Sequence, residues 1–481
     1  MSSVATEQTT IPLCVDLDGT LVKTDLVWES LVRLLRHNPL YALIVPVWLL
    51  GGRARLKDQI ARRVEVDVAS LPYQQPLIDY LRDEQRSGRR LVLATASDRK
   101  LAERVAEHIG IFNEVIASDG QRNLRGKNKA AALCQRFGEH GFDYAGNSAV
   151  DFPVWEQARQ AIIVTGSSTL PAEARKRATV SRIFETPQSG WLAFFRLLRP
   201  HQWVKNLILF VPLLTAHKIG EYALVLKAVG AFIAFCLCAS GVYVLNDLFD
   251  LDADRHHPTK RLRPFASGEL PLPFGLILVP LLLATSAILA VQLSWSLAVV
   301  LGIYVALTTS YSWRIKQIQL LDVFFLAALY TIRLIAGHEA TGVAYSFWLL
   351  VFSMFIFLSL ALVKRFLELD AAREQSRAGI RGRGYGPKDL ELVASLGSTS
   401  GYLAVLVMAL YVNSQEVRVL YHHHTLLLLM CPLLLYWISR MWLIAHRGQM
   451  HDDPIVFALK DRVSYLVGAL TLAVLWLATG H

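Results

Sequence analysis

The sequence predicts a soluble α/β domain with a Rossmann-like parallel sheet and a helical cap, followed by an all-α membrane bundle of nine helices. Hydrophobic residues make up 53% of the 481 residues and charged residues 18%, against roughly 25% charged in an ordinary soluble domain. The composition also changes near residue 200. Beyond it, residues 270–313 contain no Asp, Glu, Lys or Arg, which is long enough for two membrane spans of about 20 residues each.

The first part of the chain, residues 1–190, mixes charged and apolar residues as a soluble domain does. Its strand-like runs alternate with helix-like stretches, which indicates βαβ units and a parallel sheet. These runs are 11–15, 91–94, 114–117, 142–145 and 161–164. The interval of about 21–90 is far longer than an ordinary connection of roughly 2–6 residues and therefore predicts a helical cap.

One uncharged segment of the cap, residues 39–52, has two interpretations. It is too short to span a bilayer, since a span needs about 20 residues. It is either a buried cap helix or an interfacial helix that dips into the membrane, because it contains Trp48 and lies between Arg36 and Arg53.

The second part, residues 206–481, follows a linker or interfacial segment at 191–205. Its charge-poor runs predict nine spans, of which the first is weak. The runs are 206–216, 228–245, two within 270–313, 322–337, 340–363, 392–412, 425–439 and 463–480.

The loops between these spans predict the orientation of the chain. Seventeen Lys and Arg lie in the loops 246–269, 314–321, 364–391 and 440–462, against Lys218, Lys227 and Arg418 on the other side. Basic loops stay in the cytoplasm. We therefore expect a multi-pass protein of the bacterial cytoplasmic (inner) membrane, with its soluble domain and active sites on the cytoplasmic side. The net charge of +10 also suits anionic lipids and phosphorylated substrates. Five scattered cysteines without a CxxC pair exclude a disulfide framework.

Carboxylates cluster in the loop after the second span. Asp247, Asp250 and Asp254 follow Asn246, and the i, i+4 pair shares one face of a helix. Carboxylates that converge at the membrane surface repel one another unless a cation neutralises them. Mg²⁺ suits this task, because it binds one or two carboxylates together with substrate phosphates.

This NDxxDxxxD motif resembles that of the UbiA superfamily of intramembrane prenyltransferases. The run from Arg199 to Asn206 and the HPxKRxRPxASG run from His257 to Gly268 are similar to the branch that transfers 5-phosphoribose from phosphoribosyl diphosphate to a polyprenyl phosphate. The resemblance implies that the three aspartates hold the magnesium and diphosphate and act in catalysis, while Asn246 orients the substrate.

Further residues on the basic side are candidates for substrate binding. Lys260, Arg261 and Arg263 supply donors for phosphate oxygens. The other candidates are Lys205, Tyr311, Lys316, Asp322, Lys364, Arg365 and Asp461. Arg333 lies inside a span, where it can snorkel to the outer end, and is left out of the site.

The first predicted strand ends in DxDGT, whose carboxylates Asp16 and Asp18 point to the same side of the strand. This pattern resembles the haloacid dehalogenase-like (HAD) phosphatases. The resemblance implies that Asp16 is the nucleophile, that Asp18 is the general acid and base, and that Thr95 and Lys129 hold the phosphoryl group. A second Mg²⁺ is then held by Asp16, Asp18, Asn147 and Asp151, with Asn147 at a position where the family usually has an acid.

The two resemblances together predict a bifunctional enzyme of the cell envelope. The membrane part transfers 5-phosphoribose to a polyprenyl phosphate, and the soluble part removes the 5-phosphate to give polyprenyl-phosphoryl ribose. The alternatives are a prenyl diphosphate:aromatic acceptor transferase of quinone type and a HAD domain of separate, regulatory and non-catalytic role. The expected partners are the two substrates, the membrane and, as a possibility, a second copy of the chain, but no nucleic acid.

Overall fold

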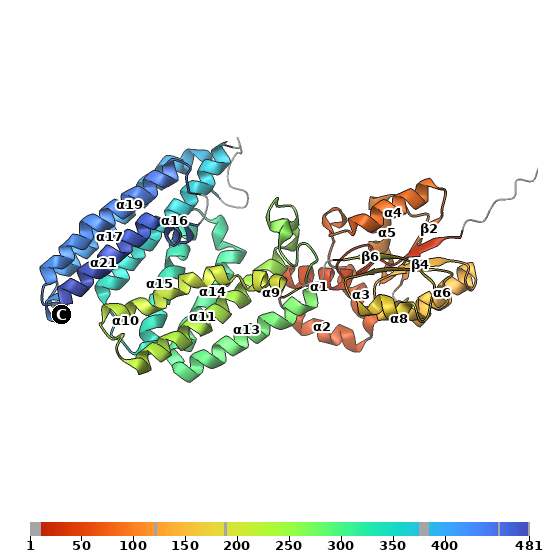
Figure 1. The fold of residues 1–481 in the computed structure, drawn as a ribbon, viewed down its shortest axis with the longest axis horizontal. Helices are drawn as coiled ribbons and strands as arrows, with labels where there is room; N and C mark the ends of the chain where they lie inside the picture. Colours follow the sequence, from red (N-terminus) through yellow and green to blue (C-terminus); the bar gives the residue numbers. More distant parts are fainter. Residues whose placement is uncertain (1–10, 120–122, 187–189, 375–383, 451–452, 480–481) are drawn as a thin grey trace, which may run out of the picture. The chain divides into compact units, whose positions relative to one another are not determined.

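The computed structural model describes residues 11–119, 123–186, 190–374, 384–450 and 453–479. The chain forms two compact units, each described below by itself. The first contains the chain up to Leu198 together with Tyr243–Val279, and the second contains Arg199–Val242 and the chain from Pro280 onward. The loop with the aspartate motif thus belongs to the same compact unit as the soluble domain. Figure 1 labels the helices and strands used below.

A parallel sheet of six strands forms the centre of the first unit. Its order is β3-β2-β1-β4-β5-β6. The strands are β1 (Leu13–Val15), β2 (Leu91–Asp98), β3 (Glu114–Ser118), β4 (Asp143–Gly146), β5 (Ala161–Thr165) and β6 (Val180–Glu185). The first five confirm the predicted strands. The sixth was not predicted, because this edge strand is half-exposed and has no continuous apolar run.

The order of the strands reverses beside β1. Leu13 pairs with Leu91 of β2 on one side and with Asp143 of β4 on the other. In open parallel sheets, the crevice at such a reversal lies beyond the carboxyl ends of the strands and is where ligands bind. The helices that follow the strands are α5 (Arg99–Ile109), α6 (Lys127–Phe137), α7 (Phe152–Trp155) and α8 (Thr169–Ala174).

Helices fill the interval between β1 and β2. They are α1 (Leu26–His37), α2 (Tyr41–Leu50), α3 (Arg53–Ala61), η1 (Val68–Ser70) and α4 (Gln75–Arg86). Leu31 and Leu34 of α1 pack with Ile60 of α3 in a small core. Helix α2 differs, since none of its residues is buried, and Leu43 and Leu50 are 75% and 89% exposed. The interpretation of 39–52 as a buried cap helix is therefore wrong: only the face formed by Tyr41, Val45 and Trp48 is partly buried against the small core, and the other apolar side chains of this helix are exposed.

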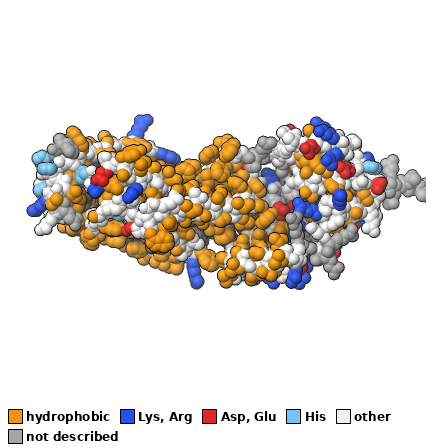
Figure 2. Space-filling model, turned by 90° about the horizontal axis from the view of Figure 1, so that it is seen from below, with side chains coloured by type: hydrophobic (Ala, Val, Ile, Leu, Met, Phe, Trp, Pro, Cys, Tyr) orange, Lys and Arg blue, Asp and Glu red, His pale blue; other side chains and the backbone are white. Residues whose placement is uncertain are grey.

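Eight helices among the described residues are long and apolar enough to cross a membrane. They are α11 (Tyr222–Phe249), α13 (Leu272–Leu293), α14 (Trp295–Trp313), α15 (Leu321–Thr341), α16 (Phe347–Glu374), η6 with α17 (Pro387–Val412), η7 with α19 (His424–His446) and α21 (Arg462–Thr479). This confirms the predicted helical membrane bundle. On the face shown in Figure 2, hydrophobic side chains form large patches over the helical part of the chain, as is expected of a surface in contact with lipid.

The weak first span of the prediction, 206–216, has a different form. It consists of η3 (Pro200–Phe210) and α10 (Val211–Thr215), each shorter than the eight candidate spans. Pro212 lies at the start of α10, and a proline cannot donate a backbone hydrogen bond to the preceding turn. The remaining short helices are α9 (Trp191–Leu198), α12 (Leu251–Arg255), η4 (Lys260–Leu262), η5 (Ile315–Gln317), α18 (Gln415–Leu420) and α20 (Pro454–Ala458).

Candidate functional site

The residues predicted to form the phosphatase centre gather at the carboxyl edge of the sheet. Asp16 directly follows β1, and its Oδ1 accepts a hydrogen bond of 2.7 Å from Lys129 Nζ. Lys129 lies near the start of α6, which begins after Gly126. Both side chains are buried. Residues that are 113 apart in the chain thus form one buried ion pair.

Tyr144 of β4 extends this pair to the acidic loop, and sequence reasoning did not find it. Its hydroxyl accepts a hydrogen bond of 2.7 Å from Lys129 Nζ and donates one of 3.1 Å to Asp151 Oδ1. Asp151 Oδ2 accepts from the backbone N–H groups of Asn147 and Ser148. Because so many donors hold Asp151, its orientation is fixed before any ligand binds. The signal that points to Tyr144 is its place in β4, two residues before the glycine that opens the acidic loop.

Asp18 is held by a different set of donors. Its Oδ1 accepts from the backbone N–H of Leu26 at 2.8 Å, and its Oδ2 accepts from Ser97 Oγ at 2.5 Å. Ser97 lies on β2, and its own backbone N–H donates to Thr95 Oγ1 at 3.0 Å. The first turn of α1 and the end of β2 therefore position Asp18 together.

Burial raises the pKa values of both catalytic candidates, Asp16 and Asp18, and so favours their uncharged forms. It raises the pKa of Asp16 to about 7, where the Lys129 charge opposes the shift and the Asp151 charge adds to it. Burial, with a further contribution from the negative charge of Asp25, raises the pKa of Asp18 to about 6. Carboxylates with pKa values near neutrality can exchange protons at physiological pH.

Asn147 lies against the loop that follows the two aspartates. Gly19 has a φ of +75°, and a Cβ atom there would come within 2.2 Å of Asn147 Nδ2, so a larger residue would displace this amide from its position. Thr20 Oγ1 donates to Asn147 Oδ1 at 3.3 Å. The Asn147 amide therefore packs against the loop after β1 and holds it by a hydrogen bond. A carboxylate at this position would add a negative charge beside Asp151.

Two carboxylates of the aspartate motif converge on one cation. Arg263 Nη1 lies 3.1 Å from Asp247 Oδ1 and 2.6 Å from Asp254 Oδ2. Asp247 lies near the end of α11, and Asp254 lies on α12. Although burial raises the pKa of Asp254, the Arg263 charge opposes the shift. The structure thus brings together two of the three predicted aspartates and one of the predicted basic residues.

The third aspartate of the motif faces elsewhere. Asp250 lies between α11 and α12, so the helix that was expected to align it with Asp254 is interrupted there. Its Oδ1 lies 3.9 Å from Arg36 Nη2 of α1. Asp250 and Asp254 therefore contact different arginines, Arg36 and Arg263.

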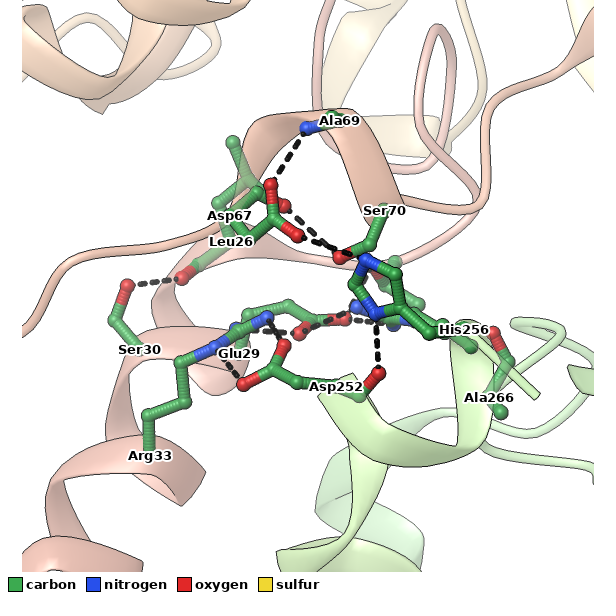
Figure 3. A network of polar contacts seen from close by, with 12 residues as sticks. Leu26, Glu29, Ser30, Arg33, Asp67, Ala69, Ser70, Asp252, His256 and Ala266 are labelled. Carbon is green, nitrogen blue, oxygen red and sulfur yellow. Dashed lines mark hydrogen bonds and ion pairs between the residues drawn. The ribbon is translucent and has the colours of Figure 1, made fainter. Parts of the chain in front are cut away.

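A network of ion pairs joins α1 of the soluble domain to α12 of the motif (Figure 3). Glu29 is fully buried and pairs with Arg33 at 2.7 Å and with Arg255 at 2.5 Å. Arg33 also contacts Asp252, with Nε 3.1 Å from Oδ2. His256 Nε2 lies 3.5 Å from Asp67 Oδ2 at the edge of the network. Sequence reasoning did not find Glu29, since its partner Arg255 is 226 residues away.

In the second unit, two predicted lysines share one carboxylate. Lys205 Nζ and Lys364 Nζ lie 3.1 Å and 3.3 Å from Asp453 Oδ2. Burial opposes ionisation of Asp453, but the two lysine charges lower its pKa below the ordinary value. Asp453 was not predicted. The available signal is an acidic residue directly before Pro454, the arrangement of a helix N-cap.

Three other candidates form ion pairs within the second unit. Arg365 Nη2 lies 2.6 Å from Asp322 Oδ2, and both side chains are fully buried. Tyr385 donates to the other oxygen of Asp322 at 2.6 Å. Asp461 forms a bidentate ion pair with Arg440, whose Nη1 and Nη2 lie 2.6 Å and 2.9 Å from the two carboxylate oxygens. This pair lowers the pKa of Asp461 to about 2. These contacts favour a structural role for the three residues.

The remaining candidates are placed as follows: half-buried Asn246 on α11, exposed Lys260 and Arg261 on η4, half-buried Tyr311 on α14 and half-buried Lys316 on η5. Arg333 is not among the predicted site residues, because a side chain there could snorkel to the outer end of its span. In the structure it is buried inside the second unit. Its Nε donates to Asn206 Oδ1 at 2.8 Å and its Nη2 to Tyr304 at 3.2 Å. A buried arginine in an apolar helix is costly unless it is paired in this way.

The donors of both centres fit a magnesium ion that is bound together with a phosphate. No three His, Cys, Asp or Glu side chains gather as a metal site in the part of the chain that the structure describes. Mg²⁺ needs only one or two carboxylates when phosphate oxygens and waters complete its shell. Asp16 and Asp151 offer one such pair, and the negative charge of Asp151 adds to the effect of burial that raises the pKa of Asp16. Asp247 and Asp254 offer another.

Comparison with known proteins agrees with this architecture. Residues 207–478 match the model of the UbiA prenyltransferase family, and residues 13–156 match that of haloacid dehalogenase-like hydrolases. The uncharacterized protein y4nM of Sinorhizobium fredii is 38% identical over 467 residues, covering 96% of this chain and 89% of that protein. Nodulation protein NoeC of Azorhizobium caulinodans is 37% identical over 290 residues, covering 60% and 92%.

A decaprenyl-phosphate phosphoribosyltransferase of Mycobacterium tuberculosis is 33% identical over 290 residues, covering 59% of this chain and 91% of that protein. Among solved structures, a UbiA homologue from Archaeoglobus fulgidus bound to GPP and Mg²⁺ aligns with a TM-score of 0.46 at 16% identity, covering 59% and 99%. Fold, motif and matches define a multi-pass membrane protein that joins a HAD-like domain to a transferase bundle. The chain belongs to the UbiA prenyltransferase family.

Proposed function

We propose that the membrane part transfers 5-phosphoribose from phosphoribosyl diphosphate to a polyprenyl phosphate, and that the HAD domain then removes the 5-phosphate. The observation that carries the first step is the convergence of Asp247 and Asp254 on Arg263 at the end of an apolar helix. Relatives named decaprenyl-phosphate phosphoribosyltransferase, 33–37% identical to this chain, support the choice of substrates.

In the transfer step, the bond between the anomeric carbon and the diphosphate oxygen breaks. An oxygen of the polyprenyl phosphate bonds to that carbon, so the products are polyprenyl-phosphoryl-5-phosphoribose and diphosphate. Asp247 and Asp254 would hold a Mg²⁺ ion, which when bound would supply positive charge against the leaving diphosphate. Arg263, with Lys260 and Arg261 from the same loop, adds donors for the phosphate oxygens.

The cationic cluster of the second unit suits the binding of a phosphorylated substrate. Lys205 and Lys364 meet at Asp453, so two positive charges share one negative charge. A phosphate that carries two negative charges can compete with a single carboxylate for these lysines. We propose that this cluster takes the phosphate of one of the two substrates.

In the hydrolytic step, Asp16 attacks the phosphorus and the ester P–O bond breaks. Asp18 gives its proton to the leaving 5-oxygen, and Lys129 and Thr95 hold the phosphoryl group. Asp18 then takes a proton from a water molecule, which attacks the aspartyl-phosphate and releases inorganic phosphate. The hydrogen bonds from Leu26 and Ser97 aim the Asp18 carboxyl for both proton transfers. Asp16 and Asp151 would hold a Mg²⁺ ion, which when bound would neutralise phosphoryl charge in this step.

Fusion of the two activities raises the effective concentration of the transferase product at the phosphatase. The basic loops on one side of the spans favour a cytoplasmic location for both sites.

The test supplies labelled phosphoribosyl diphosphate and polyprenyl phosphate to membranes that contain the full chain. We expect a labelled lipid without its 5-phosphate. Asp16→Asn should leave the transfer intact and make the phosphorylated lipid accumulate. An unchanged ratio of the two lipids would refute the relay. Labelling of hydroxybenzoate from a prenyl diphosphate, without any labelled phosphoribosyl lipid, would instead establish an aromatic prenyltransferase.

A further inference from the structure

A polar cavity of about 740 Å³ opens beside the phosphatase centre, within the first unit. The loops after β1 and β4 contribute Gly19 and Asn147. The end of β5 contributes Thr165, and the loop after it contributes Ser167. The last wall comes from the loop after the aspartate motif, residues 267–269. A volume in this range is typical of a small-molecule site.

The wall formed by residues 267–269 is packed closely against the soluble domain. Gly268 has a φ of +73°, and a Cβ atom there would come within 2.7 Å of Lys23 Cβ and 3.3 Å of Pro72 Cγ. Glu269 pairs with Arg196 at 2.5 Å. The buried pair of Glu29 and Arg255 holds the same loop further upstream. The wall is therefore a fixed part of the cavity.

The lining of the cavity indicates the chemistry of its ligand. Lys23 supplies a positive charge, Gln74 an amide, and Thr165, Ser167 and Ser267 supply hydroxyl groups. Amides and hydroxyls can donate to and accept from the hydroxyl groups of a sugar, whereas a lysine binds a phosphate as a point charge. Asp16 attacks the phosphate that is removed. Lys23 can therefore bind a second anionic group of the same ligand.

We propose that this cavity is the substrate pocket of the phosphatase for a pentose that carries a second phosphate besides the one removed, and that residues 267–269 form its specificity-determining wall. This inference rests on the proposed function, because a 5-phosphoribose joined to a lipid phosphate has both groups. Soluble ribose 1,5-bisphosphate shares the same chemistry. Residues 267–269, which follow the aspartate motif of the transferase, thus help to select the substrate of the phosphatase. Hydrolysis proceeds by the steps given above.

The experiment measures phosphate release by the full chain in detergent with three probes. Acetyl phosphate is small enough to react without filling the cavity, ribose 5-phosphate fills the sugar site, and ribose 1,5-bisphosphate also offers the second phosphate. Ser267→Leu narrows the cavity, and Lys23→Met removes its cation. Leu262→Ala changes an exposed residue of the same loop outside the cavity and serves as the matched control.

We expect Ser267→Leu to lower kcat/KM about tenfold for both ribose phosphates and less than about twofold for acetyl phosphate, because a bulky wall excludes only the larger substrates. Lys23→Met should raise KM about tenfold for the bisphosphate alone, since it removes one charge-assisted contact. Activity toward acetyl phosphate also shows that each variant is folded. Leu262→Ala should match the wild type with all three probes.

Equal losses with all three probes, or no loss with any of them, would overturn the inference. A fourth substrate, the polyprenyl-phosphoryl-5-phosphoribose made by the membrane part, is compared with ribose 1,5-bisphosphate. This comparison tells whether the pocket takes the lipid-linked or the soluble pentose phosphate. If Ser267→Leu discriminates among the soluble probes while no labelled phosphoribosyl lipid forms in wild-type membranes, the proposed transfer fails and the pocket stands. If the lipids form normally and Ser267→Leu changes nothing, the pocket fails and the transfer stands.

Discussion

The guanidinium of Arg255, the residue directly after the last aspartate of the motif, lies 2.5 Å from the fully buried carboxylate of Glu29. Glu29 belongs to α1 of the soluble domain, and the same carboxylate holds Arg33. One acidic side chain thus fixes α12, on which Asp254 lies, to the helix whose first turn orients Asp18. Loss of this side chain should therefore affect both activities.

Glu29→Gln should destabilise the first unit by about 3 kcal/mol, because it leaves buried Arg255 without its counter-charge and leaves Arg33 with Asp252 alone. The melting temperature of the full chain in detergent should fall by several degrees, and transfer of phosphoribose should fall with it. Glu103→Gln is the matched control, since Glu103 pairs with Arg99 only at the exposed surface of α5. An unchanged melting temperature for Glu29→Gln would contradict the expected role.

The pH dependence gives an independent check of this pair. Burial opposes ionisation of Glu29, but the charges of Arg255 and Arg33 lower its pKa below the ordinary value. A lowered pKa means that the stabilisation is fully present above the ordinary pKa of about 4.3 and is lost as the pH falls through the lower folded value. The difference in melting temperature between wild type and Glu29→Gln should hence shrink on acidification below about pH 4.

Arg263→Met should lower kcat/KM for phosphoribosyl diphosphate at least about tenfold. It removes the cation on which Asp247 and Asp254 converge and leaves two carboxylates that repel each other. Arg263→Lys should restore part of the activity, because one amine can contact both oxygens. Hydrolysis of acetyl phosphate by the HAD domain is the internal control. A variant that loses both activities would indicate a folding defect and would argue against a specific role in substrate binding.

Asn147→Asp should lower the Mg²⁺ concentration that gives half-maximal phosphatase activity. The amide lies against Gly19 and accepts from Thr20, and a carboxylate of the same size can keep the second of these contacts while adding a charge near Asp16 and Asp151. Ser148→Ala, which removes one donor to Asp151 without a new charge, is the control. A Mg²⁺ requirement that is unchanged in Asn147→Asp would show that residue 147 does not contact the metal environment.

Much of the fold could be predicted because its signals are local. Short, mainly apolar runs predicted the first five strands, and runs without charge predicted the helices that can span the membrane. The edge strand β6 escaped because Arg182 and Glu185 interrupt its short apolar pattern. The break between α11 and α12 also escaped, since the spacing of acidic residues says nothing about where a helix ends.

The contacts that complete the sites could not be predicted in the same way. Glu29 and Tyr144 have no motif of their own, and their roles arise from partners that only the folded chain brings near. Asp322 and Arg365 show the same limit for residues that were predicted. Their charges suggested substrate binding, and only the folded chain shows that they also pair with each other in a fully buried contact.

We expect the exposed apolar helix α2 to lie in the lipid interface. Leu43 and Leu50 are 75% and 89% exposed, and a helix of 10 residues is too short to span. An environment-sensitive fluorophore attached at Leu43→Cys in full chain reconstituted into vesicles should shift its emission to shorter wavelength and be quenched by spin-labelled lipid. The same fluorophore at Glu107→Cys, an exposed position on α5, should remain in water. Equal emission at the two positions would place α2 outside the bilayer and leave its apolar side chains to a protein partner.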